Sequence, residues 1–159
     1  MDFTQLVEQL LTVSSNCFSQ LSLESEKKRT KRLIGEILRK YCDQKPVDFV
    51  SEKAKEVADQ LELDLFMHNW HDQNKFDPGR KTFHLEHKTT IHDLTLDIIN
   101  GKDVLNTIAR IQHGWILKAE DKILNTSGKK KLREDHDAAY NEAGIELIYR
   151  PSLSCKKRK

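Results

Sequence analysis

The sequence predicts an α/β fold in which a mixed central sheet is flanked by helices and preceded by an N-terminal helical extension. Two observations support this class. Residues 1–45 carry only helical periodicity, whereas short apolar runs and amphipathic segments alternate beyond about residue 64. Strands that alternate with helices imply a sheet covered by helices. At 159 residues the chain is long enough to bury a core without disulfides.

The first half of the chain predicts three helices. Apolar residues recur at helical spacing over 3–22, and an apolar stripe opposite a basic face extends over 24–42. Pro46 breaks this pattern. Ser51 has the character of an N-cap for a further helix over 52–62, because its hydroxyl can accept a hydrogen bond from a free backbone N–H of the first turn.

The second half predicts strands and helices in alternation. Thr90 and Asp93 resemble a capping box, Asn100 and Gly101 end the helix that follows, and Pro151 ends the last strand. The expected elements are strands at 64–70 and 82–89, helices at 90–99 and 103–112, a strand at 114–118, a helix at 132–143 and a strand at 145–149.

The chain therefore divides into a helical extension (1–45), an α/β core (46–152) and a basic tail (153–159). Charged residues make up 33% of the chain but the net charge is only +2, so bulk charge does not drive it to nucleic acid. The basic residues cluster at 27–32, 129–131 and 156–159, a footprint of phosphate binding.

The three cysteines form no Cys-x-x-Cys pair, which argues against a structural zinc site and predicts reduced thiols in an intracellular, cytoplasmic protein. No apolar run approaches the roughly 18 residues of a membrane helix, so no membrane partner is expected.

The stretch from Thr82 to Thr90 carries the chemistry. Strand side chains alternate between faces, so His84, Glu86 and Lys88 are expected on one face and His87 on the other. Asp77 precedes this strand across a turn signal, Asp-Pro-Gly. Two acids and a lysine so arranged can hold a divalent metal and orient a water.

This chemistry suits hydrolysis of a phosphodiester, because a divalent metal lowers the pKa of bound water next to an anionic backbone. Asp77 and Glu86 are the candidate carboxylate ligands, and the carbonyl of His87 is a candidate third ligand. The expected cofactor is Mg²⁺, which favours oxygen ligands, with Mn²⁺ as the alternative. Lys88 is the candidate catalytic cation that stabilises the transition state.

Asp77 together with Glu86-x-Lys88 resembles the motif of the PD-(D/E)xK nuclease superfamily, which includes many type II restriction endonucleases. The resemblance covers about residues 50–150. It implies a restriction-endonuclease-like core and a magnesium-dependent endodeoxyribonuclease, with Asp77 and Glu86 binding the metal and Lys88 as the catalytic lysine. The chain departs from the pattern at one place, since Phe76 stands where a proline often precedes the first acid and Pro78 follows it.

The nuclease interpretation carries further expectations. The partner is DNA, and a homodimer is expected because one site cuts one strand; helices over 3–42 are its candidate interface. Glu52 or Glu56 is a candidate accessory acid acting through water. The candidate DNA contacts lie in the loops at 71–81 and 125–133 and are Arg80, Lys81, Lys129, Lys130, Lys131 and Arg133.

Two alternatives stay open. Glu86-His87 also resembles the opening of HNH nucleases, in which His87 would be the general base and Asn106, His113 or Asn125 a further metal ligand. A helix predicted after His87 does not match the hairpin of that family. The other alternative is a DNA-binding module without catalysis, since the helices at 24–42 and 51–62 loosely resemble a helix-turn-helix.

Overall fold

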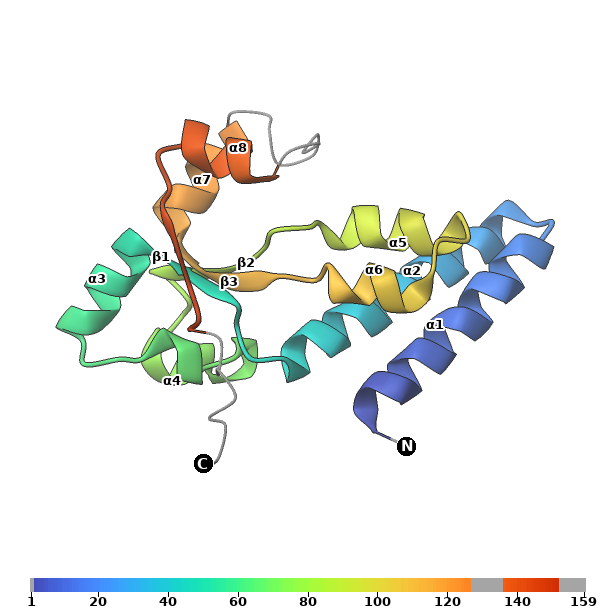
Figure 1. The fold of residues 1–159 in the computed structure, drawn as a ribbon, viewed down its shortest axis with the longest axis horizontal. Helices are drawn as coiled ribbons and strands as arrows, with labels where there is room; N and C mark the ends of the chain where they lie inside the picture. Colours follow the sequence, from blue (N-terminus) through green and yellow to red (C-terminus); the bar gives the residue numbers. More distant parts are fainter. Residues whose placement is uncertain (1, 127–135, 152–159) are drawn as a thin grey trace, which may run out of the picture. The chain divides into compact units, whose positions relative to one another are not determined.

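The computed structural model describes residues 2–126 and 136–151 (Figure 1). The chain forms two compact units and passes between them three times. Unit 1 contains Met1–Lys45 and His87–His113, and unit 2 contains the described residues of Pro46–Glu86 and Gly114–Lys159.

Unit 1 is built around four helices. Its core is built from the apolar faces of four helices, with Leu11, Ile34, Leu38, Leu94 and Ile98 fully buried. Ser15 on the first helix also donates to the carbonyl of Ile98 at 2.7 Å. The helices are α1 (Phe3–Gln20), α2 (Glu24–Gln44), α5 (Ile91–Ile99) and α6 (Val104–Ala109).

The helices of the predicted extension over 1–45 are grouped with residues 87–113 in this unit. Helices α5 and α6, which were expected to cover the sheet, pack with α1 and α2 instead. The reason is that Ile91, Leu94 and Ile98 form an apolar stripe on α5 that matches the stripe on α2. The Thr90 cap is confirmed, since its hydroxyl accepts from the N–H of Asp93 at 3.1 Å.

Unit 2 contains a four-stranded mixed sheet in the order β2-β3-β1-β4. Strands β1 and β3 are parallel, with Phe49 opposite Gly114, and β1 and β4 are antiparallel. The carbonyl of Phe49 occupies the place that a Cβ at position 114 would need, so this pairing requires glycine. The strands are β1 (Phe49–Ser51), β2 (Phe83–His87), β3 (His113–Leu117) and β4 (Leu147–Tyr149).

Strand β2 lies at one edge of the described sheet, next to β3. The pair runs antiparallel, because the N–H of Lys118 donates to the carbonyl of Thr82 at one end and the N–H of Lys88 donates to the carbonyl of Gln112 at the other. The four strands with helices around them confirm the predicted α/β class.

Apolar side chains cover both faces of the sheet. Along β3, Trp115 packs in one cluster with Phe83 and Ala54, whereas Ile116 packs in another with Leu124. Successive residues thus point to opposite faces, as strand alternation requires. The first cluster includes α3 (Glu52–Gln60); the second includes α7 (Lys118–Thr126) and α8 (His136–Glu142).

The strand predicted at 64–70 is wrong. This segment forms two short 3₁₀ helices, because the carboxylate of Asp64 accepts from the N–H of Phe66 at 3.0 Å and the side chain of Asn69 accepts from the N–H of His71 at 2.9 Å. Such local bonds replace the ladder of a strand. The elements are η1 (Leu65–Met67), η2 (Trp70–Asp72) and α4 (Gln73–Phe76).

Strand β1 was not predicted, because it has only three residues and its last one, Ser51, carried the N-cap signal. That cap is confirmed, since the hydroxyl of Ser51 accepts from the N–H of Ala54 at 3.1 Å. The basic tail at 153–159 lies outside the described residues. Within the described ranges, every helix is too short or too polar to cross a membrane.

Candidate metal centre

Strand β2 presents two polar side chains on one face. Phe83 and Leu85 pack into the apolar cluster on one side of the sheet, and His84 and Glu86 point to the other side. His84 Nε2 lies 3.4 Å from Glu86 Oε2. The side chain of Glu86 is only 3% exposed, so this carboxylate is held at the inner end of the pair.

Helix α7 brings a second carboxylate to the same place. Asp121 Oδ1 lies 3.5 Å from His84 Nε2, and the ligand atoms of His84, Glu86 and Asp121 all lie within 4.8 Å of one another. Asn125, one turn further along α7, donates from Nδ2 to Asp121 Oδ2 at 3.1 Å. Asn125 therefore orients Asp121 and leaves its other oxygen to face the imidazole.

The position of Asp121 follows from how α7 begins. The helix starts directly after β3, and Glu120 in its first turn is buried. Glu120 Oε2 accepts from the N–H of Leu117 at 2.8 Å and from the hydroxyl of Ser51 at 2.6 Å. Glu120 thus ties the first turn of α7 to the end of β1, which fixes the backbone that carries Asp121.

The donor set of one imidazole and two carboxylates suits a divalent cation. Ions bound at about 2.0–2.2 Å bring their ligand atoms to about 3–4 Å from one another, so the observed spread requires only a small closure. The mixed nitrogen and oxygen ligands fit Mn²⁺ well, whereas Mg²⁺ prefers oxygen alone. His84, partly exposed at 33%, is the side through which an ion and water can enter.

Asp77 is not part of the His84, Glu86 and Asp121 cluster, and its environment is different. The residue is only 5% exposed. Its carboxylate accepts from the N–H groups of Lys81, Thr82 and Phe83 at 3.0–3.1 Å and from Gln73 Nε2 at 3.2 Å. Burial alone raises the pKa of Asp77, but these hydrogen bonds outweigh it and hold the pKa below its ordinary value. Asp77 organises the turn that leads into β2.

Lys88 and His87 belong to unit 1. The backbone of Lys88 continues the pairing with Gln112, and the residue as a whole is only 9% exposed. His87 stacks on His113, with the ring centroids 6.1 Å apart and the planes inclined by 27°. Helix α5 begins a few residues further on, as predicted, where an HNH nuclease would have a hairpin.

The other candidate residues are dispersed. Glu52 and Glu56 are exposed on α3 and are not part of the His84 cluster. The guanidinium of Arg80 lies 3.7 Å from the ring centroid of Trp70, which leaves Lys81 as an exposed cation beside it. The candidates Lys129, Lys130, Lys131 and Arg133 lie outside the described residues. Of the proposed HNH ligands, Asn106 is exposed and His113 is buried.

Two members of the cluster were not chosen from the sequence. His84 was expected on the face of Glu86, and that shared face was the signal for it. Asp121 had only a weak signal, as the second of two acids that follow a buried strand. Only the packing of α7 against the sheet shows that Asp121 reaches β2.

The fold and the cluster together define an α/β protein with a mixed four-stranded sheet and a candidate His/Glu/Asp metal centre at its edge strand. No family model, curated protein or solved structure matches the chain.

Proposed function

We propose that this protein is a divalent-metal-dependent endonuclease that hydrolyses the phosphodiester bonds of DNA. One observation carries the proposal. Glu86, the acid of the Glu-x-Lys motif, lies in a cluster with His84 and Asp121 that has the spacing of a metal site. The mixed sheet with helices on both faces supports the finer proposal of a restriction-endonuclease-like core.

In this proposal Glu86, Asp121 and His84 hold the cation, and Asn125 keeps Asp121 oriented toward it. A bound divalent cation lowers the pKa of water and offsets the charge that develops on the phosphate. Lys88 is retained as the candidate catalytic lysine on the strength of its motif alone, because a lysine cation can stabilise the charge of a pentacovalent transition state.

Asp77 could bind the metal or stabilise the turn before β2, and an experiment can distinguish the two roles. The resemblance assigns it to the metal, but its hydrogen bonds to the turn before β2 engage both carboxylate oxygens. We propose that Asp121 takes the place of the first metal-binding acid and that Asp77 holds the turn. Metal affinity of the Asp77→Asn and Asp121→Asn variants distinguishes the two assignments.

The test is incubation of supercoiled plasmid with the protein in Mg²⁺, in Mn²⁺ and in chelator. Glu86→Gln, Asp121→Asn and Lys88→Met are expected to lose cleavage. Glu26→Gln, which removes an exposed acid of α2, is the matched control and is expected to cut normally. Absence of cleavage by the wild-type protein in every divalent metal would reject the proposal and favour a DNA-binding module.

A second candidate is an HNH-type nuclease with His87 as general base. The observation that favours it is the stacking of His87 on His113, which can fix an imidazole for proton transfer. His87→Ala discriminates the two, because it abolishes cleavage in the HNH mechanism. In the main proposal His87→Ala keeps most of the activity, since the imidazole of His87 has no role at the metal.

We also propose that the protein is a homodimer. Helix α1 exposes an apolar stripe of Phe3, Leu6, Leu10 and Val13, which lie three or four residues apart. A second copy with the same stripe would bury it, and two copies supply the two sites that double-strand cleavage needs. Light scattering after gel filtration is expected to give a dimer for the wild type and a monomer for Leu10→Lys. A monomeric wild type at all concentrations would exclude the dimer.

A further inference from the structure

Unit 1 contains a cleft of about 270 Å³ between α2 and α5. Its wall on α2 carries four cationic side chains, and α5 adds an imidazole. These residues are Lys28, Lys31, Arg32, Arg39 and His92. Among the residues that the structure describes, no aspartate or glutamate lines the cleft. Cleft and cluster are distinct sites, because the metal centre described above lies entirely in unit 2.

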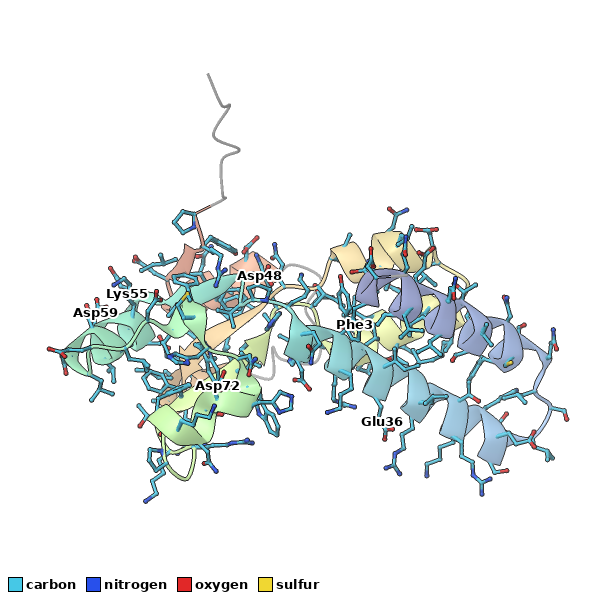
Figure 2. All side chains as sticks on the ribbon, turned by 90° about the horizontal axis from the view of Figure 1, so that it is seen from below. Phe3, Glu36, Asp48, Lys55, Asp59 and Asp72 are labelled. Atoms are coloured by element: carbon cyan, nitrogen blue, oxygen red, sulfur yellow. The ribbon has the colours of Figure 1, made fainter. Side chains whose placement is uncertain are left out.

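The charges of the cleft are poorly balanced within the described residues. Arg32 pairs with Glu36, which Figure 2 labels on α2, at 2.8 Å, but both side chains are exposed and such a pair stabilises little. Lys28, Lys31 and Arg39 have no carboxylate within ion-pair distance in the part of the chain that the structure describes. Like charges on one helix face destabilise the helix unless an anion screens them. The pattern therefore indicates an anionic ligand.

Gly35 shapes the cleft. It lies between the cations on the same face of α2, and a Cβ built at this position would come within 3.6 Å of Arg39 Nη1 and of Thr95 Oγ1. The guanidinium of Arg39 thus lies over Gly35, which is buried at the floor of the cleft. An oxyanion on Gly35 would meet a planar donor fork, which is the preferred partner of phosphate.

The cationic side chains along α2 span a length that suits a polymeric ligand. Lys28 and Arg39 are eleven positions apart, which is about 16 Å along the helix axis at 1.5 Å per residue. A single phosphate covers a fraction of that length, whereas a nucleic acid strand repeats a phosphate about every 3.4 Å of its axis. A row of cations along a helix face is a footprint of backbone binding.

We infer that the α2–α5 cleft binds the phosphodiester backbone of duplex DNA. The choice of DNA as the source of the phosphates rests on the proposed function. The contacts are to phosphate, so they supply affinity and salt dependence rather than sequence recognition. Unit 1 then binds DNA through this cleft, and the binding is separable from the metal centre of unit 2.

The experiment measures fluorescence anisotropy of a labelled duplex with the full chain in chelator, at several salt concentrations. The double variant Lys31→Gln/Arg39→Gln is compared with Arg29→Gln/Lys40→Gln, which removes the same charge from α2 outside the cleft. The cleft variant is expected to bind at least about tenfold more weakly, and its salt slope is expected to fall by about two. The control is expected to stay within about twofold.

Gly35→Leu provides a variant without a charge change. Filling the cleft is expected to weaken binding to a similar degree, and circular dichroism with thermal melting checks that the helices still form. Equal losses in both double variants would overturn the inference, because bulk charge would then explain them. Inorganic phosphate binding that Arg39→Gln abolishes, with DNA binding unchanged, would also overturn it in favour of a small-anion site.

Failure of this inference and failure of the proposed function give different results. Glu86→Gln is expected to bind the duplex normally in chelator, since the metal site is not needed for backbone contacts. A wild-type protein that never cuts DNA but loses binding in the cleft variant would retain the inference and reject the nuclease. If the wild-type protein cuts DNA but the cleft variants bind the duplex normally, the nuclease proposal is retained and the inference about the cleft is rejected.

Discussion

The turn at Asp77 and the edge strand at Glu86 offer a comparison between two buried carboxylates. Backbone N–H groups and an amide surround Asp77, and they consume the acceptor capacity of both its oxygens. Glu86 instead faces an imidazole and, within 4.8 Å, a second carboxylate. Donors around an acid stabilise its charge and the fold, whereas a second acid nearby costs energy unless a cation joins them. The different surroundings of the two carboxylates, rather than their residue types, indicate a structural role for Asp77 and a metal-binding role for Glu86.

The largest expected effect is on Glu86. Glu86→Gln removes a charged ligand, so we expect Mn²⁺ affinity and cleavage to fall by at least about 100-fold. The melting temperature is expected to stay level or to rise, because the repulsion from Asp121 is relieved. Titration calorimetry and thermal melting measure the two quantities. A large drop in melting temperature with intact metal affinity would show that Glu86 stabilises the fold and does not bind the metal.

Asp77→Asn is expected to act on the fold instead. The amide places a donor against backbone N–H groups that now donate to the carboxylate, which leaves buried donors unsatisfied and costs about 2 kcal/mol. For a chain of this length, that lowers the melting temperature by about 5 °C. Metal affinity measured below the melting transition is expected to match the wild type. Loss of that affinity would restore Asp77 to the metal site.

The pH dependence of the free energy of unfolding tests the structural role of Asp77. The pKa of Asp77 lies below its ordinary value in the folded protein, so its contribution is fully present above the unfolded pKa of about 3.9 and is lost as pH falls through the folded value. Urea unfolding between about pH 6 and pH 2 is expected to show this loss. The Asp77→Asn variant is expected to depend less steeply on pH. An unchanged pH dependence in the variant would show that other acids, such as Asp97, carry the effect.

The smallest expected effect is at Asn125, which contacts the cluster only through Asp121. Asn125→Ala frees one carboxylate oxygen, and loss of one hydrogen bond is expected to weaken Mn²⁺ binding by about fivefold. Stability is expected to change little, because Asn125 is exposed. Asn125→Asp, which adds a carboxylate at the same point, is expected to restore or raise the affinity. Equal affinities in all three proteins would place Asp121 outside the metal site.

Prediction succeeded where the signal was local. The hydroxyls of Ser51 and Thr90 accept hydrogen bonds from backbone N–H groups three residues ahead. These bonds set the starts of α3 and α5, and both caps were foreseen. It failed over 64–70, where the apolar run resembles a strand but the side chains of Asp64 and Asn69 hold 3₁₀ turns. Whether such a segment forms 3₁₀ turns or a strand depends on whether a neighbouring strand is available to pair with it.

The sequence by itself determined the α/β class and the shared face of His84 and Glu86, because both follow from periodicity along the chain. Only the tertiary structure decided which acid joins them. Asp121 meets β2 through the packing of α7 on the sheet, and no pattern near Glu86 encodes that contact. Tertiary packing also grouped α5 with α1 and α2, since an apolar stripe requires a partner but does not specify which one.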